Sequence, residues 1–263
     1  MNQNRLSRPP KTIGILGGMG PQAGFDLATK VTSQTAVARD QDHIPIVLYS
    51  QPDIPDRTAY LADAEAPNPA PAIARAFMHL EDCGAEVAGL ACNTAHTPLI
   101  FDDVTDILQS RGSHLNILHL IEETVSGIKR AYPEVERVGV LGTVGTLSSR
   151  LYDQRLEAAG FAAIQPDHTD GLTESIYNDV YGVKVCSSPA STQARDHVLE
   201  AIEQVRTKGA QMVILGCTEL PLAVPEKDIG GLALIDPAVM LARALVNHAA
   251  PDRLRPMNVS PQY

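Results

Sequence analysis

Two cysteines occupy similar positions along the chain: Cys92 in the segment LACNTAH and Cys217 in the segment LGCTEL. Each one ends an apolar run and is followed by hydroxyl or amide side chains. A thiolate can remove a proton from carbon, and a thiol can return one. We therefore interpret the two residues as an acid–base pair that acts on opposite faces of one carbon atom. The alternative interpretation is a pair of small, buried core residues.

The ionisation of a thiol depends on its surroundings, because an isolated thiol has a pKa of about 8.5. The junction between a strand and a following helix lowers that value, since the helix amides and dipole favour the anion. The pattern predicts such a junction at both Cys92 and Cys217, so we expect lowered thiol pKa values there. Cys83 and Cys186 have no counterpart in a repeat, and we interpret them as structural or incidental thiols.

Several features recur at the offset that separates the two cysteines. Residues 11–17 (KTIGILG) reappear as residues 136–142 (ERVGVLG), and Gly20 corresponds to Gly145. The pair Gly-Ala at 84–85 likewise recurs at 209–210. Matches that share one offset indicate a duplicated half, so we expect two similar units that each supply one thiol.

Short apolar runs alternate with longer segments of helical periodicity. Strands are predicted at residues 12–16, 44–49, 87–91, 115–118, 137–141, 162–165, 212–216 and 232–235. Helices are predicted at residues 21–38, 66–82, 121–131, 148–159, 169–180 and 191–208, and beginning at 98 and 237. This alternation is typical of parallel sheets covered by helices on both faces.

The predicted fold class is α/β, with two pseudo-symmetric α/β domains that contain parallel sheets. We assign residues 1–119 and the returning segment 221–263 to the first domain, and residues 120–220 to the second. Ligands of such sheets bind beyond the carboxyl ends of the strands. We therefore expect the active site in the cleft between the domains.

A glycine-rich turn, GGMGPQAG, follows the first predicted strand at residues 17–24. Its spacing resembles a dinucleotide-binding fingerprint, but Pro21 stands where a helix N-terminus should offer amides to a phosphate. No acidic residue follows the second strand promptly as a ribose partner. We favour a tight turn in which Gly18 and Met19 approach a small anionic ligand.

Arg57 and Lys184 lie in comparable loops of the two predicted halves. A single surface cation is usually solvated. Two cations beside one cleft, in a chain of net charge −10, favour the capture of a carboxylate.

The composition excludes several classes of protein. A net charge of −10 and a pI near 5.2 argue against nucleic-acid and anionic-membrane partners. We predict neither a signal peptide nor a transmembrane segment, and no CxxC pair occurs, so we expect reduced thiols in the cytoplasm. His96 lies close to Cys92, but no further ligands stand at metal spacing, so we predict no metal and expect His96 to orient a loop or cap a helix.

The chain resembles the aspartate/glutamate racemase family, which inverts amino acids with two cysteines and without a cofactor. The segments that carry the resemblance are GILGGMGP, PDIPDRT, ACNTAH, IEET, YGVK, LGCTE and LIDP. They extend from Ile13 to Pro237, and PDRT and YGVK indicate the aspartate branch. The resemblance implies interconversion of L- and D-aspartate, possible activity on glutamate, and a homodimer.

The resemblance also implies roles for individual residues. Cys92 and Cys217 would be the acid–base pair, with Cys217 acting on the L enantiomer. Arg57 and Lys184 would bind the side-chain carboxylate of the substrate. Its α-carboxylate and ammonium would be held by the residues that follow the two cysteines, namely Asn93, Thr94 and Thr218.

Glutamate racemases carry Asp-Ser where this chain has Gly17-Gly18, and His where it has Glu219. Those departures argue against a dedicated glutamate racemase, and no acidic or imidazole helper for the thiols carries over. Two alternatives stay open. One is a related isomerase of the maleate isomerase or hydantoin racemase type, and the other is a non-catalytic protein that binds acidic amino acids.

Overall fold

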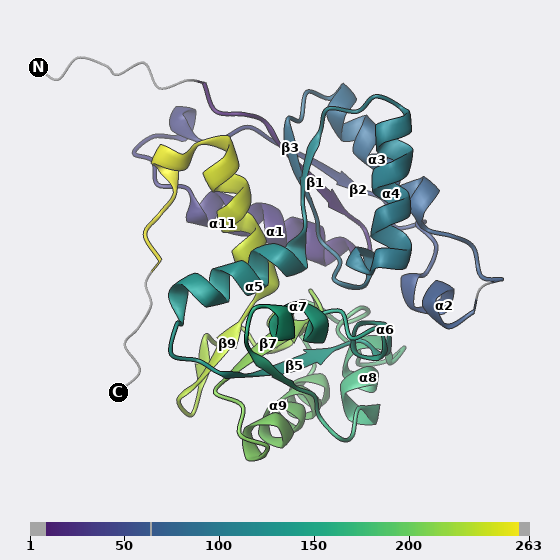
Figure 1. The fold of residues 1–263 in the computed structure, drawn as a ribbon, viewed down its shortest axis with the longest axis vertical. Helices are drawn as coiled ribbons and strands as arrows, with labels where there is room; N and C mark the ends of the chain where they lie inside the picture. Colours follow the sequence, from purple (N-terminus) through teal and green to yellow (C-terminus); the bar gives the residue numbers. More distant parts are fainter. Residues whose placement is uncertain (1–8, 64, 258–263) are drawn as a thin grey trace, which may run out of the picture.

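The computed structural model describes residues 9–63 and 65–257. Its strands form two separate sheets, seen in the upper and lower halves of Figure 1. The strand order is β2-β1-β3-β4 in the first sheet and β6-β5-β7-β9-β8 in the second. In both sheets the second strand of the unit is followed by the first and the third, and then by one further parallel strand, β4 or β9. The predicted pair of similar α/β units is therefore confirmed.

The first sheet contains β1 (Ile13–Gly17), β2 (Ile46–Ser50), β3 (Val87–Leu90) and β4 (Asn116–Leu118). All its neighbouring strands are parallel. The central strands β1 and β3 are buried along their whole length, as continuous apolar runs in a parallel sheet require. The helices of this half are α1 (Pro21–Gln34), α2 (Arg57–Ala62), α3 (Ala70–Asp82) and α4 (Pro98–Ser110).

The second sheet contains β5 (Arg137–Gly142), β6 (Ala162–Ile164), β7 (Met212–Gly216), β8 (Asp228–Ile229) and β9 (Leu232–Ile235). Only β8 runs antiparallel to its neighbour. The helices after β4 are α5 (Leu120–Ala131), α6 (Val144–Ser148), α7 (Asp153–Ala158), α8 (Asp170–Tyr177), α9 (Thr192–Thr207), α10 (Leu220–Ala223) and α11 (Pro237–Ala249).

The C-terminal part of the chain is divided between the two sheets. β9 pairs with β7, whereas α11 packs against α1, α5 and β3 (Figure 1). The sequence prediction placed all of residues 221–263 with the first domain. The ladder instead places residues 228–235 in the second sheet, because the apolar strand β9 finds its hydrogen-bonding partner in β7.

Two further differences from the predicted elements have local causes. The helix expected at 148–159 is interrupted, since Arg150 has a positive φ of 53° between α6 and α7. The loop after β2 contains the short helix α2, which the sequence prediction missed. Asp56 caps it by accepting a hydrogen bond from the Ala59 amide at 2.7 Å. This cap places Arg57 on the first turn of a helix.

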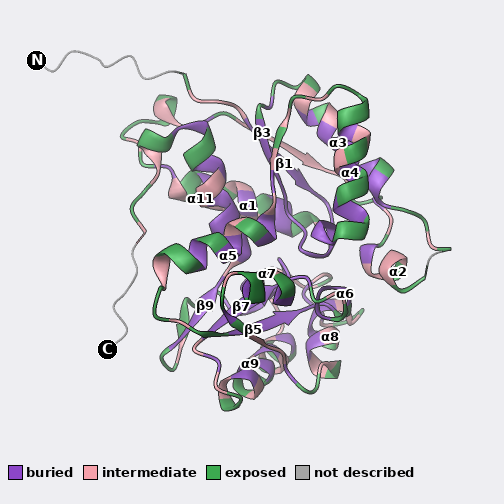
Figure 2. Cartoon of the chain, in the orientation of Figure 1, coloured by how far each residue is buried: buried purple, intermediate pink, exposed green. Residues whose placement is uncertain are grey.

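Buried residues follow the strands and the inner faces of the helices, while exposed residues lie on the outer helix faces (Figure 2). Figure 2 shows this clearly on α3 and α4, which pack against each other. No helix among the described residues combines the length and apolar character needed to cross a bilayer.

The glycine turn after β1 brings α1 unusually close to the strand that precedes it. A Cβ atom added at Gly24 would lie 2.9 Å from the Cα atom of Gly17, which is backbone and cannot rotate away. Gly171 in α8 offers a contrast, because a Cβ there would meet the His197 ring at an ordinary 3.4 Å.

We expect Gly24→Ala to lower the free energy of unfolding by up to about 2 kcal/mol. Alanine normally gains about 1 kcal/mol over glycine inside a helix, but overpacking against backbone costs roughly 1–3 kcal/mol. Urea unfolding measures the difference. The matched variant Gly171→Ala should be neutral or slightly stabilising, and a stabilised Gly24→Ala variant would contradict the close approach.

Candidate active site

A small cavity lies where the carboxyl ends of β1, β3, β5 and β7 meet. Both thiols line it, and both are buried, with Cys92 6% and Cys217 4% exposed. The lining residues come from both halves of the chain: Met19, Arg57, Thr58, Cys92, Asn93, Thr94, Thr143, Tyr177, Lys184, Cys217, Thr218 and Glu219. The structure thus brings together every predicted site residue except Gly18.

Gly18 is needed for the backbone conformation of the turn and does not line the cavity. Its φ is +106°, and a Cβ atom there would lie 2.4 Å from the backbone of Gln51. The neighbouring amide of Gly20 donates to Glu219 Oε1 at 2.9 Å. The expected contact between this turn and a small anion is therefore partly replaced by a carboxylate of the chain itself, while Met19 reaches the cavity.

Cys217 is held as a thiol. Its Sγ donates a hydrogen bond to Glu219 Oε2 at 3.0 Å. Burial, followed by the negative charge of Glu219, raises the pKa of Cys217 well above its ordinary value. The predicted lowering of this pKa is wrong, because burial and an adjacent carboxylate outweigh the dipole of α10, a helix of only four residues.

Glu219 is the functional candidate that the sequence reasoning missed. Its buried carboxylate accepts hydrogen bonds from the Gly20 amide, the Cys217 thiol and the Thr218 hydroxyl, and it pairs with Lys184 Nζ at 3.4 Å. Burial acts to raise the pKa of Glu219, but Lys184 and the donated hydrogen bonds outweigh it and lower the pKa. The available signal was a carboxylate two residues beyond a thiol at the end of a strand.

Arg57 lies beside the other thiol. Its Nη1 donates to the carbonyl oxygens of Ile54 and Pro55 at 3.1 and 3.0 Å, which fixes the guanidinium. Its Nε is buried and has no partner among the described residues. Burial acts to lower the pKa of Arg57, but the charges of Cys92 and Asp56 give a net increase, so the guanidinium stays charged.

Lys184 is the second cation of the cavity. Burial acts to lower its pKa, but the charges of Glu219, Cys217 and Cys92 raise it overall. Its Nζ also lies 5.4 Å from the centre of the Tyr177 ring. Unlike Arg57, Lys184 already has a carboxylate partner, so the two predicted carboxylate-binding cations are not equivalent.

The polar residues after the cysteines join the two halves. Asn93 Oδ1 accepts from Tyr152 Oη at 2.6 Å, and Asn93 Nδ2 has no partner among the described residues. The Thr94 hydroxyl lies 3.1 Å from that of Thr143 and 3.2 Å from that of Thr146. The Thr218 hydroxyl donates to Glu219 Oε2 at 3.1 Å.

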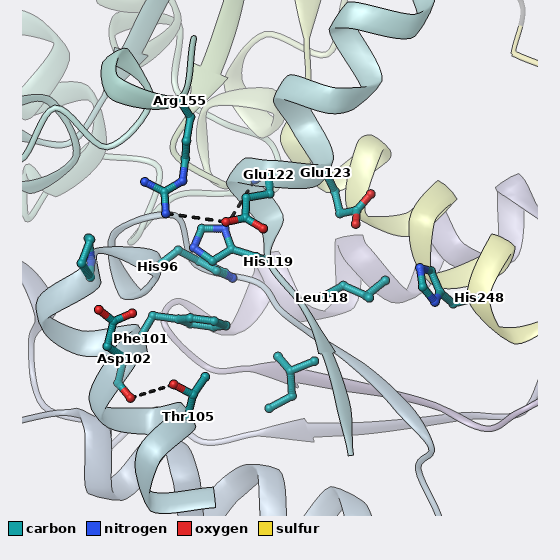
Figure 3. A pocket seen from close by; sticks show the side chains of 12 residues that line it. His96, Phe101, Asp102, Thr105, Leu118, His119, Glu122, Glu123, Arg155 and His248 are labelled. Carbon is teal, nitrogen blue, oxygen red and sulfur yellow. Dashed lines mark hydrogen bonds and ion pairs between the residues drawn. The ribbon is translucent and has the colours of Figure 1, made fainter. Parts of the chain in front are cut away.

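His96 orients the segment that carries Cys92. Its Nδ1 lies 2.8 Å from the carbonyl oxygen of Cys92, and burial lowers the pKa of His96 well below its ordinary value. The neutral ring therefore donates from Nδ1. It packs against Phe101 and His119 at the edge of a second, more open hollow, shown in Figure 3, which neither cysteine lines. Within residues 9–63 and 65–257, no group of three or more metal-binding side chains could hold a metal ion.

Comparison with known proteins gives consistent matches along the chain. The family model described as Asp/Glu/Hydantoin racemase matches residues 16–245. The broad specificity amino-acid racemase RacX of Bacillus subtilis is 27% identical over 241 residues, which cover 89% of this chain and 96% of that protein.

Solved structures show the same arrangement of two units. The aspartate racemase of Picrophilus torridus superposes with a TM-score of 0.76 at 32% identity, covering 91% of this chain and 94% of that one. A glutamate racemase from Francisella tularensis in complex with D-glutamate has a TM-score of 0.65 at 19% identity, covering 97% and 86% of the two chains. The second similarity concerns the fold alone.

We expect Glu219→Gln to lower the pKa of Cys217, because it removes a negative charge beside the thiol and frees Lys184 to stabilise the thiolate. Thiolate absorbance near 240 nm, followed against pH, measures this shift when the other cysteines are replaced by alanine.

The matched control is Glu226→Gln, which removes a carboxylate that pairs with Arg195 at the surface. This control should leave the titration of Cys217 unchanged. A Glu219→Gln midpoint equal to that of the parent would show that Glu219 does not govern the thiol.

Proposed function

The chain belongs to the Asp/Glu/hydantoin racemase family, and from that premise we propose that it interconverts L- and D-aspartate with two cysteines and without a cofactor. One observation carries the proposal: two buried thiols, one from each half, line the same small cavity, and each has a cation nearby. Proton transfer on both faces of one carbon needs this arrangement of two groups.

The two thiols begin the reaction in different states. Glu219 holds the proton on Cys217 through a hydrogen bond, whereas Cys92 lies beside the positive charge of Arg57 and is the proposed thiolate. In this state Cys92 takes the α-proton, so that the C–H bond breaks and an S–H bond forms. Cys217 then gives its proton to the opposite face of the carbon, and the inverted amino acid leaves.

The reverse direction starts from the product state of the enzyme. Cys217 is then the thiolate, and Lys184 stabilises it while Cys92 carries the proton. By the family resemblance Cys217 acts on the L enantiomer, so the resting state described above is ready for D-aspartate. The proton on each sulfur therefore decides which enantiomer the enzyme accepts next.

The intermediate is a carbanion, and the cavity must stabilise its charge with its own donors. The α-carboxylate gains negative charge as the proton leaves, and fixed donors in a water-poor site stabilise such charge strongly. Asn93 Nδ2, which has no partner among the described residues, and the Thr94 hydroxyl are the candidate side-chain donors to that carboxylate. The Thr218 hydroxyl already donates to Glu219, so Thr218 would contribute through its backbone amide.

The choice of aspartate as the substrate rests on the two cations of the cavity and on one similar protein of known structure. Arg57 has a buried Nε without a partner in the described part of the chain, which suits the side-chain carboxylate of the substrate, and Lys184 adds positive charge nearby. The aspartate racemase of Picrophilus torridus is 32% identical over nearly the whole chain. A broader range of amino acids is the second candidate, because Glu219 already neutralises Lys184 and RacX is a broad specificity enzyme.

In D2O, the wild-type protein should place deuterium at the α-carbon of L-aspartate and produce D-aspartate. Cys92→Ala and Cys217→Ala should each lower racemisation by about 10²–10⁴-fold, since each removes one proton-transfer group. The remaining thiol should still exchange the α-proton of one enantiomer, L for Cys92→Ala and D for Cys217→Ala. Proton NMR measures exchange, and chiral chromatography measures inversion.

Circular dichroism controls for the folding of both variants, and near-normal racemisation by either would overturn the two-base assignment. Binding of aspartate without α-exchange, also absent for glutamate and neutral amino acids, would favour the non-catalytic binder. Isomerisation of maleate without α-exchange would favour the related isomerase.

Arg57→Ala should lower kcat/KM for aspartate by about 10–100-fold, because a hydrogen bond to a charged group contributes roughly 1.5–3 kcal/mol. Turnover of alanine, which lacks a side-chain carboxylate, should fall less, because it loses only the support that Arg57 gives to Cys92. Steady-state racemisation of both substrates measures the difference, with Arg195→Ala at the surface as the control. Equal losses for both substrates would assign Arg57 to the support of Cys92 alone.

A further inference from the structure

Tyr152 makes one of the hydrogen bonds that join the two halves of the chain. It lies directly before α7 in the second half, and its hydroxyl reaches Asn93, the residue after Cys92, at 2.6 Å. Tyr152 does not line the cavity itself. Its contact with the site therefore passes through Asn93.

The tyrosine ring is tightly fixed. The side chain is 0% exposed, and the ring lies against Gly216, the residue before Cys217. A Cβ atom added at Gly216 would lie 3.0 Å from Tyr152 Cε2 and 2.6 Å from the Leu141 carbonyl oxygen. Tyr152 thus touches both segments that carry the thiols, and only a glycine at 216 leaves room for it.

This contact determines whether the oxygen or the nitrogen of the Asn93 side-chain amide faces the cavity. Burial raises the pKa of Tyr152 well above its ordinary value, so the phenol keeps its proton and can donate. Because Asn93 Oδ1 accepts a hydrogen bond from Tyr152, the amide group that points away from Tyr152 is Nδ2. That nitrogen is buried without a partner among the described residues, in a residue that lines the cavity. A buried donor without a partner is costly, which suits a group that awaits a ligand.

We propose that Tyr152 is a positioning residue that holds the Asn93 amide nitrogen toward the α-carboxylate of the substrate. The inference rests on the proposed racemase function and adds a residue outside the cavity to it. Without the hydroxyl, the amide can rotate, and its oxygen can face the carboxylate instead. Negative charge that builds up on the α-carboxylate then loses a fixed donor.

The test is a double-mutant cycle on Tyr152→Phe and Asn93→Ala, read out as kcat and KM for aspartate. Tyr152→Phe keeps the ring and should lower kcat/KM by about 10-fold or more, mainly through kcat, because the lost donor acts most strongly in the transition state. Asn93→Ala should cost at least as much. The double variant should be no slower than Asn93→Ala alone, since the hydroxyl acts only through the amide.

A comparison of Asn93→Asp with Asn93→Ala tests which atom of the Asn93 amide faces the substrate. Asn93→Asp still accepts from Tyr152 but presents an oxygen where the nitrogen was, so it should lose at least as much activity as Asn93→Ala. Activity of Asn93→Asp above that of Asn93→Ala would show that the side-chain oxygen of Asn93, and not its nitrogen, faces the substrate. That result would overturn the proposal. The half-buried Tyr132, away from the cavity, supplies the control Tyr132→Phe, which should keep wild-type kinetics.

The outcomes separate this inference from the proposed function. A wild-type protein without α-exchange contradicts the function itself. An active wild type with a Tyr152→Phe variant of unchanged kinetics, or with losses that multiply in the double variant, contradicts the positioning role alone. Thermal unfolding of each variant shows whether a loss of activity follows a loss of folded protein.

Discussion

The buried carboxylate of Glu219 is the group on which the arrangement of the cavity depends. A charge removed from water must be paired and hydrogen-bonded, or it destabilises the fold strongly. Glu219 meets this requirement with donors from both halves: the Gly20 amide in the first, and Cys217, Thr218 and Lys184 in the second. Satisfying one charge therefore fixes the glycine turn, one thiol and one cation relative to one another.

Glu219 also gives the two thiols of the duplicated site different surroundings. The two sheets share a strand order, and each half supplies one thiol at the end of an equivalent strand. Yet Cys217 has a carboxylate partner, whereas Cys92 has a guanidinium nearby. In the proposed two-base inversion, one sulfur is a thiol and the other a thiolate before and after each turnover, and the unequal surroundings distinguish the two sulfurs.

Polar contacts across the cavity hold the two halves in register. The hydroxyls of Thr94, Thr143 and Thr146 form a buried triangle. Tyr152 bonds to Asn93, and the Tyr177 hydroxyl lies 3.3 Å from that of Thr58. Hydrogen bonds of this kind are directional, and a buried one is costly to break. They can therefore hold opposing groups at a fixed separation where an apolar interface would permit sliding.

The sequence by itself determined the strands other than β8, the α/β class, the repeat and the identity of most cavity residues. These features follow from local periodicity and from the rule that equivalent strand ends meet at one edge of a sheet, which places Cys92 and Cys217 together. Pairing of β9 with β7, the break at Arg150 and the short helix that carries Arg57 were not visible in that periodicity.

Only the tertiary structure decided that Cys217 is held as a thiol and which way the Asn93 amide points. Both depend on contacts between residues that are distant in sequence: Gly20 with Glu219, and Tyr152 with Asn93. The expectation of a lowered pKa at Cys217 failed for the same reason. A junction after a strand can be recognised locally, but burial and the charges that surround a sulfur are properties of the folded chain.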